Sequence, residues 1–174
     1  GDQALDNTVT LPRYASGDGV QSFIIPTTVM GAATPNLRIT YTNSNGPTAG
    51  KLTPTVLPVG NTAAPVGSIV YTGTGVGKYG PFMPLAINDK GIQSVQQFNL
   101  SATYVSGVLN LVLCKPLMQI AMPTLGVVSE RDFLNQIPSL PNIVDGACLC
   151  WLQFAGSATP VSTNYYGTLD FCWG

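Results

Sequence analysis

Apolar and polar residues alternate in several short stretches of the chain, and turn-forming residues separate these stretches. The alternation is clearest in residues 37–42, and the turn signal Asn-Ser-Asn-Gly follows it at 43–46. Residues 20–25 and 67–72 have the same apolar, β-branched character. Three prolines restrict residues 51–65 to an edge strand or an extended loop. The pattern therefore predicts half-buried strands joined by tight turns.

Residues 94–104 and 108–113 predict a β-hairpin, with Ser106 and Gly107 in the turn. The first arm alternates between apolar and polar residues, and an irregularity near Gln97 indicates a β-bulge. The second arm is more continuously apolar, which is typical of a strand that is covered on both faces.

Two more apolar stretches, residues 147–154 and 165–173, predict the last strands of the chain. We therefore expect the C-terminal residues to lie inside a sheet.

One short helix is predicted after Ser129, because Ser129 and Asp132 have the spacing of a capping box. Pro138 limits this helix to about two turns. Glu130 and Asp132 could form a catalytic pair of carboxylates, but acidic residues in a first helical turn are explained by the helix dipole.

These elements amount to about seven to nine strands with no internal repeat and no linker. The expected fold class is all-β, an antiparallel β-sandwich or jelly roll with one short helix. Residues 20–174 are expected to form a single β-domain. Residues 1–19 are polar and predict an N-terminal arm, which either wraps a neighbouring subunit or remains a disordered tail.

Composition supports strands and argues against catalysis. Charged residues make up 9% of the 174 residues, against about 25% in typical domains, which excludes a helical bundle. The chain has no His, so the commonest general base and metal ligand is absent. We therefore expect no enzyme, no catalytic, cofactor-binding or metal-binding residue, and no cofactor.

The distribution of charge argues against nucleic acid and membrane as partners. The seven Lys and Arg residues are scattered and the formal net charge is -1, whereas direct binding of nucleic acid needs a clustered basic surface. The most apolar stretch, residues 108–122, is interrupted by polar residues and Pro116, so it predicts no membrane span.

The four cysteines, Cys114, Cys148, Cys150 and Cys172, are expected to be free and mostly buried. Cys148 and Cys150 share one face of a predicted strand and are badly placed to bond each other. Their spacing does not match a zinc knuckle. A disulfide that involves Cys114 or Cys172 is the alternative, and a catalytic thiol has no His to activate it.

Two other motifs have simple explanations as turns. Residues 73–80 resemble a phosphate-binding loop, but Tyr79 follows Lys78 where that motif needs Ser or Thr. A flexible hairpin loop is the better interpretation. Three aspartates beside glycines are expected to close turns: Asp18, Asp89 and Asp145. A calcium site or a pair of catalytic carboxylates would need the fold to bring these aspartates together.

Aromatic residues are frequent near the end of the chain. They are Trp151, Phe154, Tyr165, Tyr166, Phe171 and Trp173. Packing in the core is the expected role of these rings, and a platform on which sugar rings stack is the alternative.

Several short motifs spread over most of the chain resemble small structural proteins of tailed bacteriophages. They are LPRY at 11–14 with GDGV at 17–20, LRITYTN at 37–43, PFMPL at 81–85 with DKGIQSV at 89–95, KPL at 115–117 and DGA at 145–147. The resemblance implies a virion component, a capsid decoration or cement protein that binds between subunits of the major capsid protein and stabilises the shell.

Such a protein would lie on the capsid exterior after assembly in the host cytoplasm. The low density of charge leaves little electrostatic opposition to self-association, and a decoration protein at a local three-fold axis is expected to be a homotrimer. Two alternatives remain open at this point. One is a tail, neck or fibre-associated virion protein, and the other is a carbohydrate-binding or hydrolytic β-domain.

Overall fold

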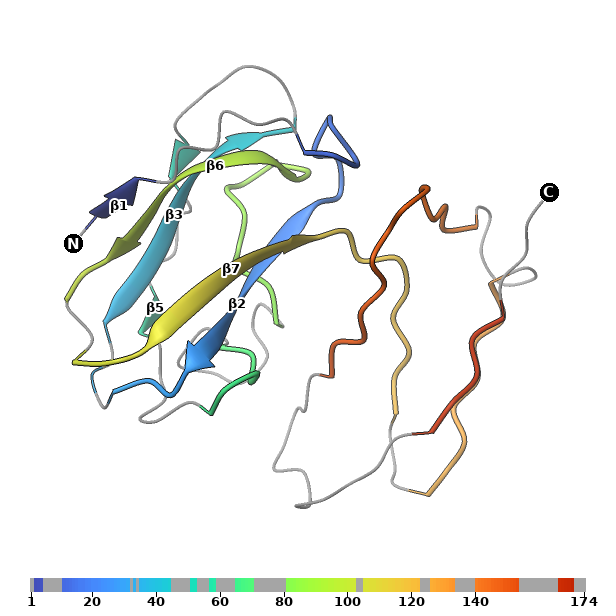
Figure 1. The fold of residues 1–174 in the computed structure, drawn as a ribbon. Coiled ribbons are helices and arrows are strands. Elements are labelled where there is room, and N and C mark those ends of the chain that lie inside the picture. The colour runs from blue at the N-terminus through green and yellow to red at the C-terminus, as the bar shows by residue number, and fades with distance from the viewer. Residues whose placement is uncertain are drawn as a thin grey trace.

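The computed structural model describes residues 2–4, 11–31, 33, 35–44, 51–52, 57–58, 65–70, 81–102, 105–122, 126–133, 140–153 and 166–170 (Figure 1). These residues form two antiparallel sheets. The first contains β1 (Asp2–Ala4), β6 (Ile92–Leu100), β3 (Asn36–Asn43) and β4 (Lys51–Leu52) in that order, with β5 (Leu57–Pro58) also paired to β3. The second contains β2 (Gln21–Thr28) and β7 (Val108–Cys114). The all-β class is confirmed, and the sandwich or jelly-roll architecture stays a prediction.

The pairing of β3 with β6 is the centre of the larger sheet. Every second residue of β3 is buried, which is the period expected of a strand with one face against the core. Ile39 lies opposite Phe98 in the register. The register shifts where Thr40 pairs with Gln97 and Tyr41 with Val95. The irregularity expected near Gln97 is therefore confirmed as a bulge.

β4 and β5 both pair with β3 at the edge of the larger sheet. They fall in residues 51–65, for which the prolines predict an edge strand or an extended loop. The strand expected at 67–72 is represented by Val70, which forms an isolated bridge with Ile24. Residues 71 and 72 lie outside the described residues.

Proline at position 26 does not end β2, which continues to Thr28. The carbonyl of Pro26 accepts a hydrogen bond of 3.0 Å from the N–H of Gly67, on the side away from β7. In an antiparallel strand the N–H and the C=O of one residue point to the same side. The N–H that proline lacks would therefore have pointed away from β7 as well. No ladder bond to β7 is lost.

The predicted β-hairpin is wrong. β6 and β7 are consecutive strands, but β6 pairs with β3 and β7 pairs with β2 (Figure 1). β7 therefore belongs to a different sheet from β6, and its leucines pack against the core from that smaller sheet.

The core is built almost entirely by the first hundred residues. Its buried cluster contains Val20, Ile24, Met30, Leu37, Ile39, Tyr41, Val70, Met83, Ile92, Val95 and Phe98. Leu109, Leu111 and Leu113 of β7 are half-buried against it. Among the described residues, none after Phe98 is buried.

The two predicted C-terminal strands are wrong for the residues that the structure describes. Residues 147–153 and 166–170 form no strand, and in Figure 1 they run as plain chain beside the sheets. A strand exists only where a neighbouring strand accepts and donates its backbone hydrogen bonds. Neither segment has such a neighbour among the described residues.

The predicted helix does not begin after Ser129. Residues 130–132 have no regular structure, and Phe133 is the first helical residue. Residues 134–139 lie outside the described residues.

Part of the expected N-terminal arm lies against the domain. β1 pairs with residues 97–99 of β6, and Leu11 and Tyr14 pack against the core. Gly17 and Gly91 meet so closely that a Cβ on Gly91 would overlap the carbonyl of Gly17. Contact of residues 1–19 with a neighbouring subunit stays a prediction.

Candidate interaction surface

One edge of the smaller sheet is covered by loops. In β2 the carbonyl of Ile24 accepts a hydrogen bond of 2.9 Å from the N–H of Val70. The carbonyls of Ser22 and Pro26, two positions before and after Ile24, also accept hydrogen bonds from loop N–H groups. Ser22 accepts from Met83 at 2.8 Å, and Pro26 accepts from Gly67 at 3.0 Å.

The opposite edge of this sheet, formed by β7, is open among the described residues. Ile24 points its backbone groups away from β7, so its partner Leu111 points its own groups away from β2. Leu109 and Leu113 follow the same alternation, whereas Asn110 and Val112 face β2. β7 therefore presents the N–H and C=O groups of three leucines on an uncharged, unpaired edge.

After β7 the chain continues into a segment with exposed apolar side chains. We call its described residues, 115–122, 126–133, 140–153 and 166–170, the C-terminal extension. Its exposed large apolar side chains are Met118, Met122, Val127, Val128, Leu140, Ile143, Leu149, Trp151, Tyr166 and Leu169. Val128 is 90% exposed and Trp151 is 62% exposed. Exposed apolar side chains that lie together on a surface mark sites of interaction with other molecules.

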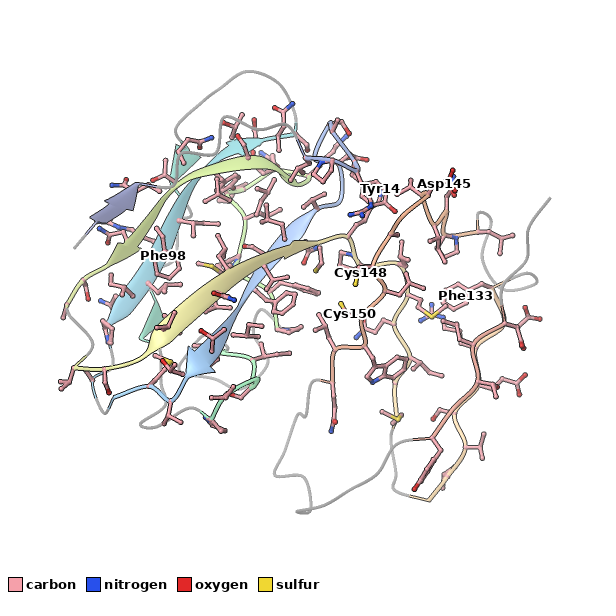
Figure 2. All side chains as sticks on the ribbon, viewed as in Figure 1. Tyr14, Phe98, Phe133, Asp145, Cys148 and Cys150 are labelled. Carbon is pink, nitrogen blue, oxygen red and sulfur yellow. The ribbon has the colours of Figure 1, made fainter. Side chains whose placement is uncertain are left out.

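The start of the extension is attached to the N-terminal segment through Tyr14. The Lys115 Nζ atom lies 4.4 Å from the centre of the Tyr14 ring, and the Tyr14 hydroxyl donates a hydrogen bond of 3.2 Å to the carbonyl of Asn142. Figure 2 shows Tyr14 and Asp145 at the same end of the molecule. These contacts fix where the extension leaves the domain, while its apolar side chains stay exposed.

Six of the 35 residues of the extension are charged, a larger share than the 9% of the whole chain. They are two cationic residues, Lys115 and Arg131, and four acidic residues, Glu130, Asp132, Asp145 and Asp170. The ten exposed large apolar side chains outnumber these charges, so we expect apolar contact to contribute most to binding at this surface.

Cys114, at the end of β7, and Cys148 and Cys150, in the extension, are free thiols. The expectation that they are mostly buried is wrong for Cys148 and Cys150, which are exposed (Figure 2). Burial, with a smaller contribution from nearby Cys150, raises the pKa of the Cys114 thiol to about 11. Cys172 lies outside the described residues.

Asp18 and Asp145 lie in turns, as expected. The expectation is wrong for Asp89, whose carboxylate accepts hydrogen bonds from the side chains of Tyr41 and Asn43 on β3. Gly17 and Gly19 beside Asp18, and Gly146 beside Asp145, all have positive φ. At Asp89 the left-handed residue is Asn88, with φ of 70°. No group of three Cys, Asp or Glu residues in the described part of the chain could hold a metal ion.

The aromatic residues divide into two groups. The expectation of core packing is wrong for Trp151 and Tyr166, whose side chains are 62% and 91% exposed. Phe154, Tyr165, Phe171 and Trp173 lie outside the described residues, as do residues 73–80 of the glycine-rich loop. Of the two carboxylates in the predicted helix, Glu130 is exposed and Asp132 is half-buried.

Comparison of the chain with protein-family models, with curated proteins and with solved structures finds no match. In the described part of the chain, no helix has the length and apolar character needed to cross a membrane.

Sequence reasoning missed the open edge of β7. The continuous apolar run at 108–113 predicts a strand covered on both faces. This prediction is wrong for β7, none of whose residues is buried. Its partner strand could not be identified from periodicity alone.

Proposed function

We propose that the chain is a structural protein of a virus particle, a capsid decoration protein. It binds as a homotrimer between subunits of the major capsid protein, on the capsid exterior, and stabilises the shell. It works by binding and not by catalysis. The resemblance of its short motifs to structural proteins of tailed bacteriophages supports the virion location.

The observation that carries this proposal is the exposed apolar surface of the C-terminal extension. Covering such side chains with another protein stabilises the complex by roughly 25 cal/mol for each Å² of apolar surface buried. A decoration protein needs this kind of surface, because it is held on the shell by contact area alone.

The proposal is tested by releasing the protein from purified virus particles. Salt between about 0.05 and about 0.5 M screens charged contacts, so it should leave the protein bound, whereas urea should release it before the shell dissociates. Release by moderate salt alone would contradict attachment through apolar contact.

A matched pair of variants shows whether the extension is the contact. Val128→Asp, at a 90% exposed position in the extension, should reduce retention on the particles. Ile87→Asp is the control, because Ile87 is 87% exposed but lies outside the extension. Equal retention of the two variants would show that the shell binds another surface.

A carbohydrate-binding domain is the second candidate, favoured by the exposure of Trp151 and Tyr166. Sugar rings stack on exposed aromatic faces of this kind. Retention of the free protein on a glycan resin, lost in Trp151→Ala, would support this candidate over the first.

A further inference from the structure

Two free thiols lie where the C-terminal extension meets the smaller sheet. Cys114 is the last residue of β7, and Cys150 belongs to the extension. Figure 2 shows Cys150 beside the end of β7. Burial is the larger cause of the raised pKa of the Cys114 thiol, and the charge of Cys150 is the smaller one. Because the effect of a charge falls off with distance, the two thiols lie close to each other although they are far apart in the sequence.

Contacts with the N-terminal segment hold the extension at this end of the sheet. Lys115, the first residue after β7, has its Nζ atom 4.4 Å from the centre of the Tyr14 ring. The Tyr14 hydroxyl also donates a hydrogen bond of 3.2 Å to the carbonyl of Asn142. A Cβ on Gly146 would lie 3.7 Å from the Arg13 guanidinium. The N-terminal segment therefore contacts both stretches of chain that lead to the two thiols.

We propose that Cys114 and Cys150 are a redox pair, which an external small-molecule disulfide converts into one intrachain disulfide bond. The bond fixes the extension, with its exposed apolar side chains, to the end of β7. The two thiols are the form expected in a reducing cytoplasm, and the bond is the form expected in an oxidising exterior. This chemistry depends on the position of the two thiols and not on a location in a virus particle.

The bond forms through two thiol–disulfide exchanges. The thiolate of Cys150 attacks one sulfur of oxidised glutathione, so that a mixed disulfide forms and one glutathione leaves as a thiolate. The thiolate of Cys114 then attacks the Cys150 sulfur and releases the second glutathione. The protons of the two cysteine thiols end on the two glutathione thiols. Two cysteines are oxidised and one glutathione disulfide is reduced, so atoms and electrons balance.

Burial determines the order of the two exchanges. Cys150 is exposed and meets the oxidant first, whereas Cys114 is half-buried. Since burial raises the pKa of the Cys114 thiol to about 11, few of these thiols are ionised at neutral pH and the second exchange is the slower one. Residues 147–153 form no helix or strand. Cys150 can therefore move to the Cα separation of about 4.4–6.8 Å that a disulfide needs without breaking a strand ladder.

The test is a disulfide map of the full chain after incubation with oxidised glutathione. Remaining thiols are blocked by alkylation before digestion. Trypsin separates Cys114 from the other cysteines, because Arg131 is the last basic residue of the chain. We expect the peptides on the two sides of Arg131 to stay joined until a reductant is added. Fragmentation of the joined peptides should place the bond between Cys114 and Cys150.

Cys148→Ser is the matched control, because Cys148 is exposed like Cys150 and lies two positions before it. Among the described cysteines, Cys150 alone acts electrostatically on Cys114. Cys148→Ser should therefore keep the yield of joined peptides, whereas Cys150→Ser should lower it about tenfold or more. Both substitutions are at exposed positions, so neither changes the core.

Three results would overturn the proposal. One is a bond from Cys114 to Cys148 or Cys172 in the wild-type chain. Another is glutathione that stays on Cys150 without exchange to Cys114. The third is a yield of joined peptides that rises with protein concentration, because the bond would then form between chains.

Amide hydrogen exchange measures whether the bond fixes the extension. We expect the amides of residues 147–153 to exchange more slowly in the oxidised chain than in the reduced chain. Cys148→Ser should show the same difference as wild type, and Cys150→Ser should show none. Equal exchange in the oxidised and reduced wild-type chains, with the bond formed, would contradict the fixing of the extension to β7.

Discussion

Tyr41 and Asp89 are joined by a hydrogen bond of 2.7 Å from the tyrosine hydroxyl to Oδ2 of the carboxylate. The same hydroxyl accepts a hydrogen bond of 2.8 Å from the N–H of Ala86. Asn43 donates from Nδ2 to the other carboxylate oxygen at 2.8 Å. Tyr41 and Asn43 are both buried on β3, so this network fixes residues 81–90 to the central strand.

Tyr41→Phe should therefore destabilise the domain. The substitution keeps the ring but leaves the Ala86 N–H and one oxygen of Asp89 without this partner, at a cost of about 1–3 kcal/mol. Urea unfolding followed by fluorescence measures the effect. Tyr166→Phe is the control, because its side chain is 91% exposed, and equal stability of the two variants would show that the network contributes nothing.

Stability should fall at alkaline pH because of Cys114. The pKa of this thiol is raised from 9.0 to about 11 in the folded chain, so the unfolded chain loses its proton first. The stabilisation is present below about pH 9 and is lost as the pH rises through about 11.

Cys114→Ala should remove part of this loss. The urea midpoints of wild type and variant are compared at pH 8 and pH 10.5, with Cys148→Ala as the control because Cys148 is exposed. If Cys114→Ala loses as much stability as wild type between these pH values, the thiol does not titrate as described.

The contact between the N-terminal segment and β6 depends on a glycine. A Cβ on Gly91 would overlap the carbonyl of Gly17 and lie 2.8 Å from the Gly19 nitrogen. Because these are backbone atoms that cannot rotate away, we expect Gly91→Ala to cost more than 1 kcal/mol, on the order of an overpacked core site.

Gly167→Ala is the matched control, since nothing lies within 4 Å of a Cβ at that position. Thermal unfolding compares the two. The close packing of residues 17–20 on β6 would be wrong if both alanine variants melt at the wild-type temperature.

The sequence allowed the strands with a clean alternation to be predicted, and it did not reveal their partners. β3 and most of β2 lie where the pattern places them, because burial of one face has a local period. The partner of β7 was wrongly predicted, because periodicity says which face of a strand is buried and not which strand lies beside it.

The C-terminal segments show the other limit. Residues 147–153 have the composition of a strand, but they form no strand in the structure and pair with none of the described strands. The exposure of the Leu149 and Trp151 side chains could not be predicted either, because an apolar strand pattern normally indicates burial in the core.

The copy number of the chain in purified virus particles tests the central claim most directly. Quantitative mass spectrometry gives its molar ratio to the major capsid protein, and surface labelling of intact particles shows whether it lies outside the shell. We expect a fixed ratio with many copies per particle, all accessible from the exterior. One or a few copies per particle, or none, would contradict the role of a capsid decoration protein.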